Sequence, residues 1–302
     1  MKQFLVIDVG GTAIKYSLMD EEANILEKGE TPTNLELGLE GYLDNLFSIY
    51  KQYEGKVEAI AMSAPGKIDA IKGYFYTGGA LSFISNFDMK KAMEEKTGIP
   101  FCVENDAKAA ALAEIWKGSM QGIENGSVIT LGTGIGGALI FNGKLYRGST
   151  FAAGEYSCVS ARLDKPYDPR KMWASQNGVG VMVADYANRV NKDVKELNGR
   201  ILFENANNGQ QEALDAIDAF TQGLATGILS LQTIIDVQRI AIGGGISKQP
   251  LLMESLNKQL HSMYDPYQAF LPESLPEIVP CTFGNDANMI GALYHYLYEV
   301  KK

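Results

Sequence analysis

Residues 4–19 read FLVIDVGGTAIKYSLM, and residues 127–141 read SVITLGTGIGGALIF. Each stretch is an apolar run, a glycine-containing turn and a second run with apolar residues, which is typical of two antiparallel strands joined by a tight turn. The two stretches differ in sequence but share this order of features. We therefore predict two copies of one structural unit, each beginning with a β-hairpin.

The rest of the chain alternates between two apolar patterns. Segments with apolar residues at helical spacing alternate with short continuous apolar runs, which is characteristic of an α/β fold. The expected helices cover 39–50, 107–116, 212–236 and 287–300, and the expected strands cover 57–62, 100–103, 239–242 and 277–283.

Composition limits the chemistry that the chain can perform. The 302 residues include 32 Gly, more than the usual share of roughly 7 percent, but only 2 His and 3 Cys. His261 and His295 lie far from the glycine clusters and leave little for a histidine metal site or a Ser-His-Asp hydrolase. Both are expected on the surface or at its boundary. The length suits two domains, with one very large domain as the alternative.

Charge and cysteine usage limit the partners and the compartment. The formal net charge of −9 gives no basic surface for nucleic acid or anionic lipid. No signal-peptide pattern or stretch of membrane-spanning length occurs, so a cytoplasmic location is expected. Cys102, Cys158 and Cys281 form no C-x-x-C pair, which fits a reducing compartment and argues against structural zinc.

Gly132 to Gly137 match the G-x-G-x-x-G pattern of dinucleotide-binding proteins. In those proteins a helix follows the glycines directly, whereas here 138–141 reads as a strand, so the dinucleotide interpretation fails. A glycine hairpin can still bind phosphate through its backbone N–H groups. The turn at Gly10-Gly11 alone is equally compatible with an ordinary hairpin, but the second glycine turn favours two turns that hold a nucleotide.

Four motifs occur in a fixed order: Asp8-Val9-Gly10-Gly11-Thr12, Glu104-Asn105-Asp106-Ala107, Leu131 to Gly137, and Gly243-Gly244-Gly245-Ile246-Ser247. Together they resemble the ATPase core of the actin-like sugar kinases and, more narrowly, the ROK family of bacterial sugar kinases and repressors. The resemblance covers about residues 1–160 and 225–297. It implies two actin-like, ribonuclease H-like domains with a nucleotide cleft between them. The domains would be 1–118, to which a C-terminal helix at 286–302 crosses back, and 119–285.

The resemblance also implies that three of these motifs, those at Asp8, Gly132 and Gly243, take part in binding ATP. Asp8 would hold Mg²⁺ through water, and the glycine turns would approach the phosphates and the adenosine. The implied nucleotide-binding residues are Asp8, Gly10, Gly11, Thr12, Lys15, Gly132, Thr133, Gly134, Gly136, Gly243, Gly244 and Gly245.

Asp106 is the candidate catalytic base, because phosphoryl transfer to an alcohol needs a carboxylate that accepts the hydroxyl proton. The alternative is that Asp106 only caps the helix expected from Ala107 onward. A position at the carboxyl end of a strand, where α/β proteins bind their ligands, makes both roles compatible.

The resemblance implies that Asn86, Asn105, Asp106 and Glu155 contact the sugar. Gly66 would shape the floor of the substrate site. Ser157 and Cys158 replace the Gly and His that follow Glu155 in the family's motif, and its cysteine cluster is missing, so no structural zinc is expected. In the alignment that the resemblance implies, Lys171 takes the place of a further sugar-binding Glu. These departures suggest altered selectivity at the anomeric end of the sugar, so a β-glucoside could be a substrate.

The resulting prediction is an ATP-dependent kinase that phosphorylates a hexose or β-glucoside, at O6 in the expected case. Alternatives are a kinase for N-acetylmannosamine or another hexose, and a non-catalytic sugar sensor or regulator on the same scaffold. The expected partners are ATP, Mg²⁺ and the sugar, without nucleic acid or membrane. The resemblance further implies a homodimer.

Overall fold

The computed structural model describes residues 2–160 and 167–301. The described residues form two compact units. The first lies within Met1–Gly118, Arg147–Ala153 and Asn285–Lys302, and the second within Ser119–Tyr146 and Gly154–Gly284. The short segment Arg147–Ala153 thus belongs to the first unit although its neighbours on both sides belong to the second, which no sequence pattern predicted.

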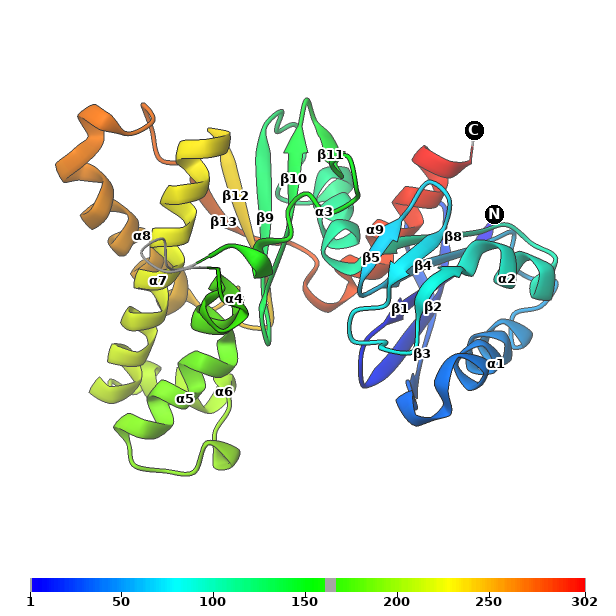
Figure 1. Cartoon of the computed structure of the whole chain (residues 1–302), viewed down its shortest axis with the longest axis horizontal. Coiled ribbons are helices and arrows are strands. Elements are labelled where there is room, and N and C mark those ends of the chain that lie inside the picture. Colours follow the sequence, from blue (N-terminus) through cyan, green and yellow to red (C-terminus); the bar gives the residue numbers. More distant parts are fainter. Residues whose placement is uncertain (1, 161–166, 302) are drawn as a thin grey trace. The chain divides into compact units, whose positions relative to one another are not determined.

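The first unit is built on a five-stranded sheet in the order β3-β2-β1-β4-β8 (Figure 1). The first three strands are antiparallel neighbours, whereas β4 and β8 run parallel to β1. The strands are β1 (Gln3–Val9), β2 (Ala13–Asp20), β3 (Ile25–Pro32), β4 (Ile60–Ala64) and β8 (Phe101–Asn105).

Helices bury both faces of this sheet, because alternate residues of a strand point to opposite faces. Leu5 and Ile7 of β1 pack in one core cluster with Leu46 of α1. The Phe4 ring, on the other face, lies 5.6 Å from the ring of Tyr296 near the end of the chain. The helices are α1 (Gly38–Lys51), α2 (Met89–Thr97), α3 (Asp106–Lys117) and α9 (Ala287–Tyr294), and α9 packs against α3.

The final helix departs from the predicted regular helix over 287–300. Its α-helical part ends at Tyr294, and His295–Val300 continue as a π-helix. The Lys301 N–H donates to the carbonyl oxygen of Tyr296, five residues earlier. Such wider turns are rare and often occur at functional sites.

A small antiparallel sheet in the order β5-β6-β7 follows β4 in the chain. Its strands are β5 (Lys67–Asp69), β6 (Tyr74–Thr77) and β7 (Ser85–Asp88). Buried Phe75 and Ile68 join the same core cluster as Leu5, so this sheet is packed onto the first unit.

The second unit repeats the same strand arrangement in the order β11-β10-β9-β12-β13. Strands β9 to β11 are antiparallel neighbours, and β12 and β13 run parallel to β9. The prediction of an α/β fold with two hairpin-initiated copies is therefore confirmed. The strands are β9 (Gly126–Leu131), β10 (Ile135–Phe141), β11 (Lys144–Tyr146), β12 (Arg239–Gly244) and β13 (Glu277–Pro280).

The long helix α7 organises the core of the second unit. Its buried Leu224 and Ile228 belong to one cluster with Ile240 and Ile242 of β12 and Leu252 of α8. Burying each such side chain contributes about 1.5–3 kcal/mol. The helices are α4 (Trp173–Asn177), α5 (Val179–Arg189), α6 (Gly199–Asn207), α7 (Gln211–Ile235) and α8 (Pro250–Tyr264), and 3₁₀ turns lie at Tyr156–Cys158, Pro169–Lys171, Val194–Glu196 and Asp265–Phe270.

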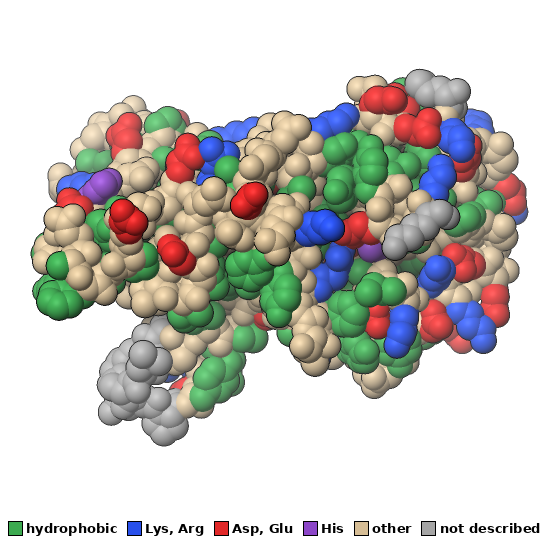
Figure 2. All heavy atoms as spheres, turned by 90° about the horizontal axis from the view of Figure 1, so that it is seen from above, with side chains coloured by type: hydrophobic (Ala, Val, Ile, Leu, Met, Phe, Trp, Pro, Cys, Tyr) green, Lys and Arg blue, Asp and Glu red, His purple; other side chains and the backbone are tan. Residues whose placement is uncertain are grey.

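Charged side chains of both signs are mixed on the surface. Figure 2 shows Lys and Arg interspersed with Asp and Glu on the face that it draws. Exposed ion pairs such as Lys51 with Glu54, at 2.7 Å, contribute little stability. Within the described part of the chain, no helix has both the length and the hydropathy needed to cross a bilayer.

Candidate active site

The parallel strands of the first unit bring several predicted site residues to one edge of the sheet. Asp8 of β1 is in register with Ser63 of β4, which is in register with Glu104 of β8. Asn105 ends β8 and Asp106 begins α3. Two motifs almost one hundred residues apart therefore leave the sheet at the same end, where α/β proteins bind ligands.

Asp8 is a partly buried carboxylate that is held by the end of the chain. The Asn288 side chain on α9 donates a hydrogen bond of 3.0 Å from Nδ2 to Asp8 Oδ1. Burial raises the pKa of Asp8, and the Asn288 hydrogen bond and the charge of Lys15 offset this only in part. Lys15 is the register partner of Asp8 on β2. A carboxylate in this situation gains from a cation, and oxygen ligands suit Mg²⁺.

The Gly10–Thr12 turn is fixed by Thr33, which follows β3 and is buried. Thr33 Oγ1 donates to the carbonyl oxygen of Gly10 at 2.7 Å, and the Thr33 N–H donates to the carbonyl oxygen of Thr12 at 3.0 Å. Gly10 N also donates to Ala13 O at 2.9 Å. These bonds hold the predicted phosphate-binding turn in one shape. Thr33 was not identified from the sequence, because it lies outside the glycine motif.

Asn105 and Asp106 form a hydrogen-bonded pair at the start of α3. Asn105 is the helix cap, since its Oδ1 accepts from Lys108 N at 3.2 Å. Its Nδ2 donates to Asp106 Oδ1 at 3.0 Å and to Gly66 O at 3.1 Å. Asp106 Oδ1 also accepts from Ala107 N at 2.8 Å. The alternative in which Asp106 is the cap is therefore wrong, and Gly66, Asn105 and Asp106 lie together.

Gly66 requires glycine at its position. Its φ is +111°, and a Cβ there would collide with the carbonyl oxygen of Thr77. The Gly66 carbonyl that accepts from Asn105 is thus presented by backbone that other residues adopt only with strain.

Asn86 and Glu155 are exposed. Asn86 is in β7 with a φ of 49°, and its Nδ2 donates to Ser85 Oγ at 3.3 Å. Glu155 belongs to the second unit and accepts a short hydrogen bond from Ser157 Oγ. Their sugar-binding roles stay predictions.

In the second unit, two glycine motifs lie side by side at the ends of parallel strands. Gly244 of β12 is in register with Leu131, which ends β9 and directly precedes Gly132. The Gly132–Gly134 turn is closed by a bond of 3.0 Å from Gly132 N to Gly134 O, and Val179 N at the start of α5 donates to Gly132 O at 2.9 Å. Gly132 and Thr133 are exposed, Gly136 pairs with Thr130, and Gly245 directly follows β12.

We expect Gly244→Ala to lower the free energy of unfolding by roughly 2–4 kcal/mol. The φ of Gly244 is +99°, and a Cβ there would collide with the Leu131 carbonyl oxygen. Urea unfolding followed by circular dichroism measures the change. Gly245→Ala is the matched control, because no heavy atom lies within 4 Å of its added Cβ. Equal urea midpoints for both variants would contradict the prediction.

Tyr156 is a buried core residue that directly precedes Ser157 and Cys158, the two residues that differ from the family motif. Its hydroxyl and Ser127 Oγ are 2.6 Å apart, and burial raises the pKa of Tyr156 to about 12. Its ring covers Gly137. Cys158 and Lys171 are exposed on either side of the residues 161–166 that the structure does not describe.

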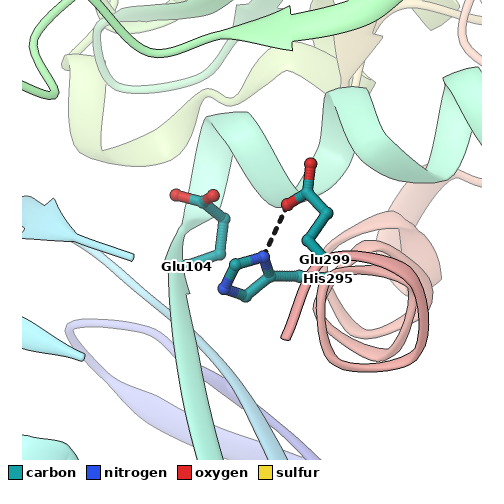
Figure 3. Close-up of side chains that lie close together, drawn as sticks. All are labelled: Glu104, His295 and Glu299. Carbon is teal, nitrogen blue, oxygen red and sulfur yellow. Dashed lines mark hydrogen bonds and ion pairs between the residues drawn. The ribbon is translucent and has the colours of Figure 1, made fainter. Parts of the chain in front are cut away.

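His295 is buried, with 2% of its surface exposed, so the prediction that it lies on the surface or at its boundary is wrong. The side chain of His261 is 63% exposed, as expected. Figure 3 shows His295 beside Glu104 and Glu299. His295 Nδ1 is 2.6 Å from Glu299 Oε2, and its Nε2 is 3.2 Å from the carbonyl oxygen of Ala70. The spacing of His295 and Glu299, four residues apart on a helix, is the signal that could have identified this pair.

Comparisons with known proteins agree with this architecture. The model of the ROK family matches residues 4–298. A β-glucoside kinase of Klebsiella pneumoniae is 33% identical over 290 residues, 96% of this chain and 94% of that protein. A ROK family protein from Streptococcus pneumoniae TIGR4, solved in complex with sucrose, has a TM-score of 0.85 at 30% identity and covers 98% of both chains. A ROK family glucokinase from Streptomyces griseus, solved in complex with glucose and AMPPNP, has a TM-score of 0.82 at 25% identity over 96% of this chain and 98% of that chain.

Proposed function

Because this chain belongs to the ROK family, we propose that it is an ATP-dependent carbohydrate kinase that phosphorylates a sugar hydroxyl with Asp106 as the base. The arrangement of Asn105 and Asp106 is the observation that carries this proposal. Asn105 caps α3, and its amide group together with the Ala107 N–H holds Asp106 Oδ1 in place. A carboxylate held in one orientation at a strand end is suited to accept a proton from a bound alcohol.

In the proposed reaction, the sugar oxygen forms a bond to the γ-phosphorus of ATP. The bond between that phosphorus and the β–γ bridging oxygen breaks, and ADP leaves with the electron pair. The hydroxyl proton passes to the Asp106 carboxylate. Positioning and charge stabilisation are the protein's main contributions to such a transfer.

The nucleotide is assigned to the glycine turns and to Asp8. Gly10–Thr12 in the first unit and Gly132–Gly134 and Gly243–Gly245 in the second are the proposed phosphate-binding and adenosine-binding segments, with Lys15 as an added positive charge. Asp8 would hold Mg²⁺ through water, and the burial that raises its pKa makes a cation favourable there. When bound, Mg²⁺ would neutralise charge on the phosphates.

A β-glucoside phosphorylated at O6 is the proposed substrate, with another hexose such as N-acetylmannosamine as the alternative. The relative from Klebsiella pneumoniae, named a β-glucoside kinase, supports this choice. The replacement of the family's His by exposed Cys158 supports it as well, because a smaller side chain leaves room at the anomeric end of the sugar. Gly66, Asn86, Asn105, Asp106 and Glu155 are the proposed sugar-contacting residues, and the site is assigned no structural zinc.

The described surface of the second unit also supports the proposed homodimer. Ile234 at the end of α7, and Tyr267 and Phe270 after α8, are 78%, 62% and 89% exposed. Burial of these three side chains against a second copy of the chain would remove their apolar surface from water. The reaction is assigned to the cytoplasm.

We expect ADP release from Mg-ATP to depend on sugar, with faster turnover of cellobiose or gentiobiose than of glucose. The panel also contains N-acetylglucosamine, N-acetylmannosamine and fructose, and a reaction without sugar is the blank. Turnover of N-acetylhexosamines alone would overturn the β-glucoside assignment. Sugar binding by calorimetry without ADP release for any sugar would favour the non-catalytic sensor.

A further inference from the structure

Four polar side chains, Glu104, Arg147, His295 and Glu299, form a largely buried network in the first unit, next to the proposed base. Glu104 is contributed by β8, and Arg147 is contributed by the segment Arg147–Ala153. His295 and Glu299 are contributed by the π-helix. Arg147 Nη2 lies 2.7 Å from Glu104 Oε2 and 2.5 Å from Glu299 Oε2, and Arg147 Nε also donates to Glu104 Oε2 at 2.7 Å. Segments from three distant parts of the sequence therefore meet at one guanidinium group.

The network is an ion-pair cluster and not a metal centre. One ligand atom each from Glu104, His295 and Glu299 lie within 4.8 Å of one another, a spacing that a metal ion could use. Arg147 already bridges the two carboxylates with its planar group, and a guanidinium is the residue type suited to such bridging. Both carboxylates are therefore already paired with one positive charge, that of Arg147.

The charges in this cluster depend on one another. The Glu104 side chain has no exposed surface and that of Arg147 only 16%. Burial alone would lower the pKa of Arg147, but Glu104 and Glu299 raise it above its ordinary value. Burial alone would raise the pKa of Glu299, but His295 and Arg147 lower it to about 2. Removing one partner would leave an uncompensated buried charge.

Glu104 connects the cluster to the proposed catalytic pair. Its Oε2 accepts from Arg147, while its Oε1 accepts the backbone N–H of Asn105 at 2.7 Å. Asn105 in turn donates to Asp106 Oδ1. The orientation of the Asp106 carboxylate thus depends on a chain of bonds that begins at the guanidinium group.

We propose that Arg147 is a positioning residue, which acts through Glu104 to fix the turn that carries Asn105 and Asp106. Glu299, which is itself held by His295, keeps the guanidinium of Arg147 in place. This inference rests on the proposed kinase function. Arg147 does not touch the reacting atoms in this scheme. Its effect is on the geometry of the base, and small misplacements of a catalytic group cost rate more than affinity.

The test is a steady-state comparison of Arg147→Met with the wild type, on a sugar that the wild type phosphorylates. We expect kcat to fall by about 10–100-fold, with the KM for ATP and for the sugar changed by less than about threefold. Arg147→Lys should recover part of the loss, because it keeps the charge but not the two-pronged contact. Arg239→Met is the matched control, since Arg239 pairs with Glu277 at 2.6 Å in the second unit.

A double-mutant cycle separates positioning from simple loss of stability. If Arg147 acts through Glu104, Glu104→Gln combined with Arg147→Met should lower kcat no further than Arg147→Met alone. If Arg147→Met does not fold, the same cycle is made with Arg147→Lys. The proposal would be overturned if the Glu104 and Arg147 substitutions lowered kcat by factors that multiply in the double variant. It would also be overturned if a destabilised Arg147 variant, assayed well below its Tm, had the wild-type kcat.

Amide hydrogen exchange gives a readout that does not require kinase activity. Because Glu104 Oε1 holds the Asn105 N–H, loss of Arg147 should accelerate exchange of the peptide containing residues 104–108. The same peptide should exchange normally in Arg239→Met. Unchanged exchange in the Arg147 variants would reject the positioning role even if the wild type phosphorylates no sugar, so the two proposals fail separately.

Discussion

Replacing Asp106 by Asn should lower kcat for sugar phosphorylation by about 10²–10⁴-fold. Asn keeps the oxygen that accepts from Asn105 and Ala107, so the turn should keep its shape. It cannot accept the hydroxyl proton, because an amide is not basic enough. A coupled assay of ADP release measures kcat, and calorimetry of ATP and sugar binding should give affinities within a few-fold of the wild type.

The control for this substitution is Asp193→Asn. Asp193 caps a short 3₁₀ helix and, like Asp106, accepts from a backbone N–H, in this case that of Lys195 at 2.9 Å. An Asn serves equally well at such a position, so activity should be unchanged. Near-normal turnover by Asp106→Asn would show that Asp106 is not the base. The kinase assignment would then rest on the proposed nucleotide-binding residues alone.

Asp8→Asn should lower activity with Mg-ATP by about 10–100-fold, the usual cost of losing a group that orients a metal through its outer shell. The same variant should melt at or above the wild-type Tm at pH 8 without ligand. Burial raises the pKa of Asp8, so its ionised form opposes folding, and the wild type loses this part of its stability as the pH rises through the folded-state pKa. Thermal melts across pH, with activity titrated against Mg²⁺, measure both effects.

Asp20, at the other end of the same β1–β2 hairpin, provides the matched control. Burial alone would raise the pKa of Asp20, but hydrogen bonds from Asn24 and from the Glu22 backbone lower it. Asp20→Asn should therefore lower Tm at neutral pH, the opposite sign from Asp8→Asn. A drop in Tm for both variants would show that the Asp8 carboxylate is structural.

The fold could be predicted where a short stretch of sequence carries a recognisable pattern of apolar residues and glycines. The two glycine turns and the alternating apolar runs predicted the two hairpins, and the solved ROK structures share the resulting fold. Strand β3 (Ile25–Pro32) was missed, because its sequence ILEKGETP has no apolar face. As an edge strand of the sheet it is mostly half-exposed or exposed and needs little hydrophobic patterning.

The site could be predicted only in part, for a related reason. Asp8 and the Asn105–Asp106 pair are visible because each belongs to a short motif. Asn288 binds Asp8 from 280 residues away, and Arg147 reaches Glu104 from another part of the chain. Such contacts leave no local pattern. His295 was placed at the surface because its carboxylate and carbonyl partners, which make burial acceptable, appear only in the folded chain.

The packing of α9 onto the first unit has a consequence for how the protein is made. Strand β1 is synthesised before the second unit, but the first unit is completed by α9, which follows the second unit in the chain and in which Gly291 lies against the backbone of Ala109. The nascent first unit must wait, with part of its core uncovered, while the whole second unit is synthesised. A polypeptide released before residue 287 would lack Asn288, His295 and Glu299. Premature termination should therefore yield an unfinished first unit in which the proposed catalytic turn is not assembled. Chaperone demand should concentrate on that interval of translation.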